Sequence, residues 1–318
     1  MPRKNQAPIN HQLSIFEPRI KGELFELKQQ NTAFELLYQK ETGKLFQGNS
    51  IQWLKSLEKE SIDLIVADPP YNIKKADWDK FETQEQYIEW SMEWIKEASR
   101  ILTKTGTLYV CGFTEILADL KHPAMKYFKR CKWLIWYYKN KANLGKDWGR
   151  SHESILHLRK GNDFTFNIDT VRIPYGKHTL KYPSHPQAIT SQYGNNSKNH
   201  NDWTPHPQGA KPKDVLEIPT TCNGMKEKTP HPTQKPEELL RRLILASSNE
   251  NDLILDPFSG SGTTLVVAEQ LNRKWLGCDI CNEYNQWAIK RLENIIYKSQ
   301  EEWIAFDREN QERRTSIR

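Results

Sequence analysis

Two short motifs place chemically useful groups directly after apolar runs. In the first, Asp68, Pro69, Pro70 and Tyr71 follow the apolar residues 61–67. Consecutive prolines fix φ and remove two amide donors, so the backbone carbonyls there point outward as hydrogen-bond acceptors. A carboxylate and a carbonyl beside an aromatic ring suit a planar ligand with an NH₂ group, since they accept its two N–H bonds while the ring stacks. Taken alone, the tetrapeptide is equally explained as a rigid strand exit.

The second motif is a glycine-rich segment between two apolar runs. Its residues are Asp256, Pro257, Phe258, Ser259, Gly260, Ser261, Gly262, Thr263 and Thr264. Glycines at a strand-to-helix turn let a ligand approach the backbone, and the helix N-terminus offers free N–H groups. An acid, Asp279, ends the next apolar run 15 residues past Thr264, a position that suits a ribose diol. No lysine follows the glycines, so the pattern favours a nucleoside-cofactor site over a phosphate loop of the P-loop type.

Predicted strands and helices, which must position these motifs, alternate along the chain. Short apolar runs predict strands at residues 61–67, 107–110, 134–137, 154–158, 253–255 and 275–278. Apolar residues recur at helical spacing in residues 88–102 and 265–271 and after Pro236, which is expected at the first helical position. Such alternation predicts an α/β sheet covered on both faces.

Three segments lack this regular pattern. Residues 1–44 read as a polar lead-in with helical patches, such as residues 34–37. Residues 184–213 contain few aliphatic side chains and many Gly, Pro, Asn, Ser and His, which predicts a long loop or a partner-facing insertion. The tail after Tyr297 is expected to be a charged helix or disordered.

Composition excludes several classes of protein. The chain has 318 residues, and no stretch of it approaches the roughly 18 apolar residues of a membrane span. The basic N-terminus lacks the apolar region of a signal peptide. Five cysteines argue against a disulfide framework and for a reducing compartment, so we expect a cytoplasmic protein with no membrane association. The 34 aromatic residues exclude wholesale disorder.

The positive charge is concentrated in the middle of the chain. The formal net charge is +6, but residues 139–235 carry 15 Lys and Arg against 8 Asp and Glu, a net +7, which leaves −1 for the rest. Seven of the nine histidines lie between His152 and His231. Nucleic acid is the obvious acidic partner, and an ordinary solvated surface is the alternative.

The two motifs together with a third resemble a known family. The third is HPTQKP, from His231 to Pro236, which lies just before the glycine-rich motif. The chain resembles the S-adenosylmethionine-dependent amino DNA methyltransferases, and its order, DPPY first and the glycine-rich motif last, is that of their β group. The resemblance covers residues 43–297, and His152-Glu153-Ser154 is similar to a later strand motif of the family.

The resemblance implies roles for particular residues. The catalytic residues would be Asp68, Pro69, Pro70 and Tyr71, which hold the target base. The cofactor-binding residues would be Asn49, Ala67, Thr233, Lys235, Asp256, Pro257, Phe258, Ser259, Gly260, Ser261, Gly262, Thr263 and Asp279. Among them Asp279 would bind the ribose hydroxyls, and Thr233 and Lys235 would lie near the methionine end. Asn49 stands where the family often has an aspartate near the cofactor adenine.

The resemblance also implies a fold. It is a doubly wound, mixed seven-stranded α/β sheet with one antiparallel strand, with permuted motif order and an inserted target-recognition region. The expected division is an N-terminal extension (1–44), a catalytic half (45–159), the target-recognition region (160–225), a cofactor-binding half (226–298) and a C-terminal tail (299–318). The basic, His- and Asn-rich segment thus falls where DNA would be recognised.

The activity that the resemblance implies is methyl transfer to the N6 amino group of an adenine flipped out of double-stranded DNA. N4-cytosine methylation is the main alternative, although the cytosine enzymes more often carry Ser at the position of Asp68. A catalytically silent DNA-binding relative is another, against which both intact motifs argue. No metal site is expected, because the Cys278–Cys281 pair stands alone and the histidine spacings are irregular. Whether a cognate restriction endonuclease shares the site, or the chain forms a homodimer, stays open.

Overall fold

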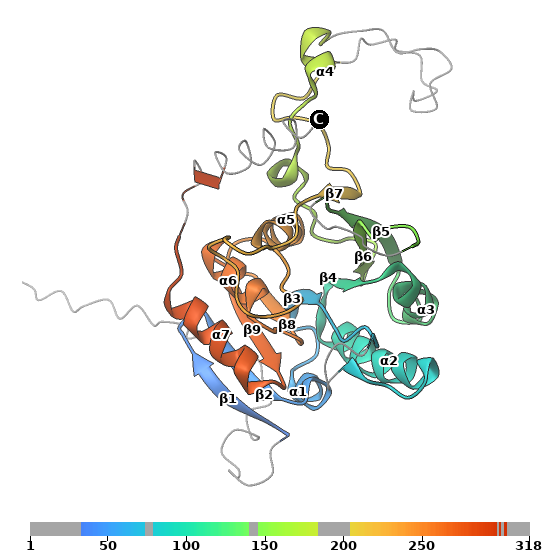
Figure 1. Ribbon diagram of the computed structural model, residues 1–318, viewed down its shortest axis with the longest axis vertical. Helices are drawn as coiled ribbons and strands as arrows, with labels where there is room; N and C mark the ends of the chain where they lie inside the picture. Colours follow the sequence, from blue (N-terminus) through green and yellow to red (C-terminus); the bar gives the residue numbers. More distant parts are fainter. Residues whose placement is uncertain are drawn as a thin grey trace, which may run out of the picture.

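A mixed sheet is the framework of the molecule. The structure is a computed structural model that describes residues 33–73, 79–139, 146–183, 204–297, 299 and 302–303. These residues form one nine-stranded sheet with the strand order β1-β2-β9-β8-β3-β4-β6-β5-β7 (Figure 1). The strands are β1 (Phe34–Gln39), β2 (Gly43–Gly48), β3 (Ile62–Ala67), β4 (Leu102–Gly112), β5 (Arg130–Tyr137), β6 (His152–Arg159), β7 (Val215–Glu217), β8 (Leu253–Asp256) and β9 (Lys274–Asp279).

Seven of these strands form the sheet that was expected. From β2 through β9, β8 and β3 to β4 all neighbours are parallel, and β6 runs antiparallel to both β4 and β5. The expectation of seven strands is nevertheless too low for the sheet as a whole. An edge strand is added at each end: β1 antiparallel to β2, and the three-residue β7 parallel to β5.

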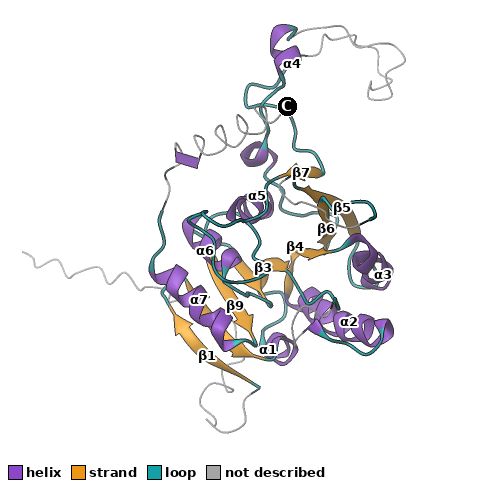
Figure 2. Ribbon diagram, viewed as in Figure 1, coloured by secondary structure: helices purple, strands orange, loops and turns teal. Residues whose placement is uncertain are grey.

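Helices cover both faces of the sheet (Figure 2). They are α1 (Ser50–Ser56), α2 (Gln84–Ile101), α3 (Thr114–Ala124), α4 (Lys177–Lys181), α5 (Glu237–Ser247), α6 (Thr263–Gln270) and α7 (Asn282–Glu293), with a 3₁₀ turn at Ile168–Val171. The helices α1, α2 and α3 pack on one another, as do α5, α6 and α7, one group on each face. Within the described residues, no helix is long and apolar enough to span a membrane.

The central strand β3 shows why an unbroken apolar run correctly predicted a strand that is buried on both faces. Its alternate side chains enter opposite cores: Ile65 and Ala67 pack with α1, α2 and α3, whereas Leu64 and Val66 pack with α5, α6 and α7. A strand covered on both faces needs apolar residues at every position, as parallel strands usually do. The sequence-based strand and helix assignments around both motifs are therefore confirmed.

Other local predictions need correction. Residues 34–37, expected to be helical, belong to β1, because pairing with β2 outweighs the helix propensity of Glu and Leu. Pro236 is the N-cap of α5, so the helix begins one residue later than expected. Of the expected loop at 184–213, residues 184–203 lie outside the described part, and Ala210 forms an isolated bridge with Ile173. Of the tail at 299–318, the structure describes residues 299, 302 and 303.

Candidate active site

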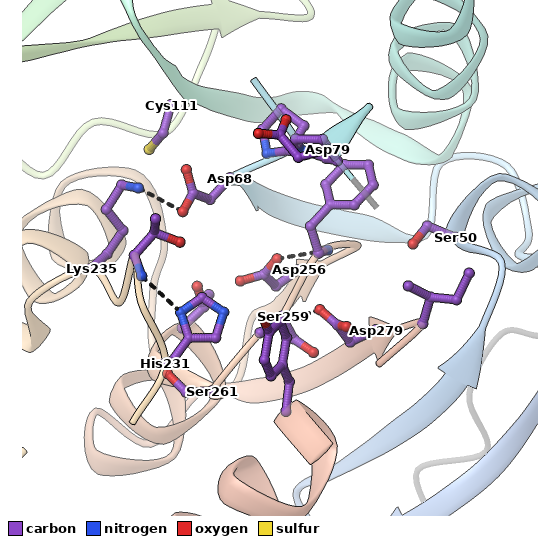
Figure 3. Close-up of a pocket in the computed structure, with 18 of the residues that line it drawn as sticks. Ser50, Asp68, Asp79, Cys111, His231, Lys235, Asp256, Ser259, Ser261 and Asp279 are labelled. Carbon is purple, nitrogen blue, oxygen red and sulfur yellow. Dashed lines mark hydrogen bonds and ion pairs between the residues drawn. The ribbon is translucent and has the colours of Figure 1, made fainter. Parts of the chain in front are cut away.

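The two motifs meet at one edge of the sheet. Because β9, β8 and β3 are parallel neighbours, their carboxyl ends bring Asp279, Asp256 and Asp68 to the same edge. The three aspartates line one pocket of about 280 Å³ (Figure 3). In open α/β sheets, ligands bind beyond the carboxyl ends of the strands. This pocket is the candidate active site.

Asp68 is held by two donors. The Nζ atom of Lys235 donates to its Oδ2 at 2.6 Å (Figure 3), and the hydroxyl of Tyr71 donates to its Oδ1 at 2.6 Å. Lys235 is buried, and its Nζ also lies 3.4 Å from Oε2 of Glu153. Burial alone would lower the pKa of Lys235, but the charges of Asp68 and Glu153 outweigh it and raise that pKa above its usual value. The ammonium therefore stays charged and keeps a cation against Asp68.

Tyr71 lies differently from the prediction that its ring stacks on a planar ligand. Its side chain lines the pocket but is only 9% exposed, and its ring meets Phe113 edge-on with centroids 5.0 Å apart. Burial, followed by the charges of Asp68 and Glu153, raises the pKa of the hydroxyl well above its usual value. The hydroxyl therefore stays protonated and acts as a donor. A stacking role remains a prediction for the DNA-bound protein.

The backbone after Asp68 is fixed by its neighbours. The hydroxyl of Tyr87 on α2 donates to the carbonyl of Pro70 at 3.0 Å, so this carbonyl is paired, contrary to the expectation of an open acceptor. Beyond Tyr71 the chain turns through Asn72 at φ +57°, and the carboxylate of Asp79 accepts from the amide of Asn72 at 2.6 Å. The tetrapeptide from Asp68 to Tyr71, which was predicted to be catalytic, is thus followed by a backbone held in place by hydrogen bonds.

The glycine-rich turn after β8 has the geometry that glycine permits. Gly260 and Gly262 have φ of +50° and +74°, in the left-handed region. A Cβ atom at Gly262 would lie 2.7 Å from Cβ of Ala288 on α7, and one at Gly260 would lie 3.1 Å from Nε2 of His231. The turn can therefore pack this closely on α7 and on the HPTQKP segment only with glycine at these positions.

Two carboxylates organise the turn. Asp279 accepts from the amide of Gly260 at 2.7 Å and from that of Cys281 at 2.9 Å, and Asp256 accepts from the amide of Phe258 at 3.0 Å. Burial raises the pKa of Asp279, an effect that the hydrogen bonds from the backbone oppose. Burial also raises the pKa of Asp256, to about 7. Asp256 therefore carries a proton over part of the neutral range.

Most of the predicted site residues line this pocket. Those that do are Asp68, Pro69, Pro70, Tyr71, Asn49, Thr233, Lys235, Asp256, Phe258, Ser259, Gly260, Ser261, Thr263 and Asp279. Asn49 does so while capping α1, where its side chain accepts from the amide of Gln52 at 3.0 Å.

Three predicted cofactor residues do not line the pocket. Ala67 points into the hydrophobic core, where it is fully buried. Pro257 accepts a hydrogen bond from Ser50 through its carbonyl, and Gly262 packs against α7. Their contribution to the pocket is indirect, since they shape the backbone of the turn. The ammonium of Lys235 lies on the carboxylates of Asp68 and Glu153, and its predicted place near the methionine end of a cofactor stays a prediction.

Glu153 and His231 are two residues of the site to which sequence reasoning gave no role. Glu153 is the second residue of the antiparallel strand β6, whose amino end lies beside the carboxyl end of β4, and it reaches Tyr71 and Lys235. His231 lines the pocket, and its Nδ1 accepts from the amide of Thr233 at 3.3 Å. Burial lowers the pKa of His231 to about 4, so the ring is neutral at physiological pH. Both residues stand in segments that resemble family motifs, and this resemblance was the signal in the sequence that could have identified them.

Aromatic and apolar groups complete the pocket wall. The ring of Phe258 packs on Trp90 and Trp94 of α2, with centroids 5.7 and 5.3 Å apart. Ile51 and Ile280 also line the pocket. An apolar wall beside the acceptor carboxylate of Asp279 suits a ligand with a flat heterocycle and a ribose.

The chain matches a family and several characterised relatives. The family model described as DNA methylase, of the N6/N4 type, matches residues 62–290. The Type II methyltransferase M.HpaI of Haemophilus parainfluenzae is 37% identical over 258 residues, which are 79% of this chain and 74% of that protein. The DNA adenine methyltransferase YhdJ of Escherichia coli is 34% identical over 266 residues, 82% of this chain and 86% of that one.

The likeness extends to solved structures. The PvuII DNA methyltransferase, a cytosine-N4-specific enzyme, superposes with a TM-score of 0.59 at 18% identity, over 84% of this chain and 91% of that one. At this identity the match concerns the fold. With the family model spanning most of the chain, and the DPPY and glycine-rich motifs lining one pocket, the chain belongs to the N6/N4 DNA methylase family.

Proposed function

We propose that this protein transfers a methyl group from S-adenosylmethionine to the N6 amino group of an adenine flipped out of double-stranded DNA. The observation that carries the proposal is the shared pocket of Asp68 and Asp279. An acceptor for an amine and an acceptor for a ribose lie on its wall, separated in the sheet by the single strand β8. This arrangement suits a target base and a cofactor that must come into contact for the methyl group to be transferred.

The residues present fit the cofactor. Asp279 is a carboxylate that accepts ribose hydroxyls readily, and Phe258 and Ile280 offer apolar surface to an adenine ring. The hydroxyl of Ser259 is buried and has no hydrogen-bond partner among the described residues, so a polar ligand group can satisfy it. When bound, S-adenosylmethionine supplies a methyl group activated by a positively charged sulfur.

Asp68 and the carbonyl of Pro69 receive the target amine. An exocyclic amine is a poor nucleophile because its lone pair is delocalised into the base. Two acceptors on its hydrogens favour a more tetrahedral nitrogen, and fixed geometry supplies most of the catalysis. Asp68 also stabilises the positive charge that develops on the nitrogen. The ammonium of Lys235, 2.6 Å away, holds the carboxylate of Asp68 in place for this role.

We assign DNA recognition to residues 160–225, between the catalytic half (45–159) and the cofactor-binding half (226–298). In the described part of this region α4 projects away from the sheet (Figure 1) and exposes Lys177 and Lys181. Leu180 and Tyr182 beside them are 65% and 52% exposed. Cations with exposed apolar and aromatic groups suit phosphates and unstacked bases. Flipping costs a few kcal/mol, which such contacts offset.

The direct test is product analysis. The protein is incubated with unmethylated genomic DNA and S-adenosylmethionine labelled in the methyl group, and the DNA is then hydrolysed to nucleosides. We expect the label in N6-methyladenine. Label in N4-methylcytosine would assign the cytosine reaction, and absence of label despite DNA binding would assign a silent DNA-binding role; either result contradicts the proposal.

Further aspects of the biological role are proposed on the same basis. M.HpaI carries the name of a Type II methyltransferase, so we propose that a cognate restriction endonuclease recognises the same DNA site as this chain. We also propose that the protein works in the cytoplasm, and as a homodimer. Resistance of plasmid DNA to endonucleases after expression of the chain tests the first point, and light scattering of the purified protein tests the oligomeric state.

A further inference from the structure

Asp68 and three neighbouring side chains form a closed ring of contacts. Tyr71 and Lys235 each donate to Asp68 at 2.6 Å, one to each carboxylate oxygen. The same two donors each lie 3.4 Å from a single oxygen, Oε2 of Glu153. Two donors are thus shared between two carboxylates, and both sit closer to Asp68.

This arrangement bears on the proposed reaction. The amine of a target base has to donate to Asp68, whose Oδ1 already accepts from the hydroxyl of Tyr71 and whose Oδ2 accepts from the ammonium of Lys235. Each oxygen keeps a second lone pair, but an amine that approaches from the side of Tyr71 has to displace its hydroxyl. Tyr71 has a single hydroxyl hydrogen, whereas Lys235 has three N–H donors. If Tyr71 leaves Asp68, its buried hydroxyl needs another acceptor, because an unpaired buried donor is costly.

Glu153 is placed to be that acceptor. It is only 8% exposed and stands on β6, where it pairs with Trp136 of β5, so its backbone position is fixed by the sheet. A short movement of Tyr71 would shorten the present 3.4 Å contact to Oε2. The ring of Tyr71 is held between Phe113, 5.0 Å away, and the ammonium of Lys235, 5.4 Å from its centroid. These contacts allow a small shift and oppose a large one.

We propose that Glu153 is a positioning residue that takes over the Tyr71 hydroxyl, and keeps Lys235 in place, when Asp68 turns to the target amine. The inference rests on the proposed function, because it assumes that Asp68 receives an amine. Glu153 itself touches neither substrate nor cofactor. Its effect on methyl transfer passes through Tyr71 and therefore disappears when Tyr71 has no hydroxyl.

A double-mutant cycle tests this dependence. The variants are Glu153→Gln, Tyr71→Phe and both together, with Glu89→Gln, an exposed acid on α2, as the matched control. Single-turnover methyl transfer is measured with enzyme in excess over the methylation sites of unmethylated genomic DNA. The number of sites is taken from the methyl groups that the wild type transfers when the reaction is complete. Affinity for S-adenosylhomocysteine is measured by calorimetry on the same samples.

We expect Glu153→Gln to slow transfer by about tenfold in the wild-type background, the equivalent of one weakened buried hydrogen bond. In the Tyr71→Phe background the same change should slow transfer by about twofold or less. Affinity for S-adenosylhomocysteine should stay within about threefold throughout, and Glu89→Gln should match the wild type. Glu153→Asp goes through the same cycle, so that the test stands if the Gln variant does not fold.

Two results would overturn the inference. One is an equal slowing by the Glu153 substitution with and without the Tyr71 hydroxyl, which a general structural role would produce. The other is no slowing at all. Both require an active wild-type enzyme, so they are distinct from failure of the proposed function, which would leave the wild type without N6-methyladenine product.

Discussion

The side chain of Asp68 is partly exposed to the pocket and is held from two sides. A carboxylate that receives an amine must be fixed in orientation. Here the buried ammonium of Lys235 compensates its charge, and the hydroxyl of Tyr71 fixes its orientation. The pocket supplies a charged acceptor at the place where the strand β3 ends.

Replacing Asp68 with Asn tests this role. The amide keeps the size of the side chain but removes the negative charge and presents hydrogens on one side, so it cannot accept from the target amine as the carboxylate does. We expect methyl transfer to fall by at least about a hundredfold, on the scale of losing one electrostatic stabiliser of a transition state. Transfer is measured with labelled cofactor under single-turnover conditions.

The matched variant is Asp279→Asn, on the cofactor side of the same pocket. It weakens an acceptor that now holds the amides of Gly260 and Cys281, so we expect cofactor affinity to fall by about tenfold or more. Asp68→Asn should leave that affinity within about threefold. If Asp68→Asn weakened cofactor binding as strongly as Asp279→Asn, the division of roles between the two carboxylates would be wrong.

Site residues next to a motif were predictable, and those that depend on strand order were not. Asp68 and Asp279 each follow an apolar run directly, so local sequence was enough to choose them. Glu153 reaches the site only because β6 is antiparallel and starts at the edge where β3 ends. Lys235 was chosen, but its contact with Asp68, 167 positions away in sequence, depends on packing between distant segments.

Among the elements, the turn between β8 and α6 lines the part of the pocket that we assign to the cofactor. Gly262→Ala should destabilise the protein by about 2 kcal/mol, because a left-handed φ is unfavourable for alanine and the new Cβ would lie 2.7 Å from Cβ of Ala288. Urea unfolding measures the change. Gly176→Ala is the control, since an added Cβ there meets nothing within 4 Å. Equal stability of the two variants would contradict this account of the turn.

The helix α4 and the segment around Lys211 are the described parts of the chain that we expect to face DNA. Changing Lys177, Lys181 and Lys211 together to Gln should weaken DNA binding and reduce its dependence on salt, by about one unit of slope per lost phosphate contact. Fluorescence anisotropy at several salt concentrations measures the slope. The control changes three exposed lysines of α2 and its neighbours: Lys96, Lys121 and Lys126. A slope that fell equally in both triple variants would show that α4 is not the DNA-binding element.

The predictable elements are those buried on both faces. The strands β3, β8 and β9 carry continuous apolar runs because helices cover them on each side, and this pattern is visible in sequence. The edge strands have no such pattern: β1 is partly exposed along its length, and β7 has three residues. Their conformation is decided by the neighbouring strand, which local sequence does not contain.

At the scale of the whole molecule, a buried histidine links stability to pH. His157 is 3% exposed and stacks on Tyr109 with ring centroids 4.7 Å apart, and its Nε2 has no partner among the described residues. Burial, with smaller contributions from Arg159 and Lys132, lowers its pKa to about 3. The unfolded chain binds the proton near pH 6.5, so this group reduces stability as pH falls below that value.

His157→Phe should remove this effect while it keeps an aromatic ring in the stack. Between pH 7 and pH 5 the variant should gain about 2 kcal/mol of unfolding free energy relative to the wild type. Urea unfolding at the two pH values gives the difference. The exposed His122→Phe is the control. A His157 variant whose difference from the wild type did not change with pH would show that the native histidine is not held neutral.

Charge is unevenly distributed over the molecule. Residues 139–235 carry +7, whereas the residues outside this stretch, which include DPPY and the glycine-rich motif, carry −1. Part of the basic stretch lies in β6 and in the site itself, where Lys235 contacts Asp68. The remainder includes α4. The placement of the charge, between the two motifs in sequence, is more informative than its size.

If this pocket methylates adenine at N6, expression of the protein should leave that mark on the DNA of its host. The chain and its Asp68→Ala variant are expressed in a bacterial host without DNA methylation, and the nucleosides of the host DNA are quantified by mass spectrometry. N6-methyladenine should accumulate with the wild-type chain and be absent with the variant. N4-methylcytosine in its place, or equal N6-methyladenine with both chains, would contradict the claim.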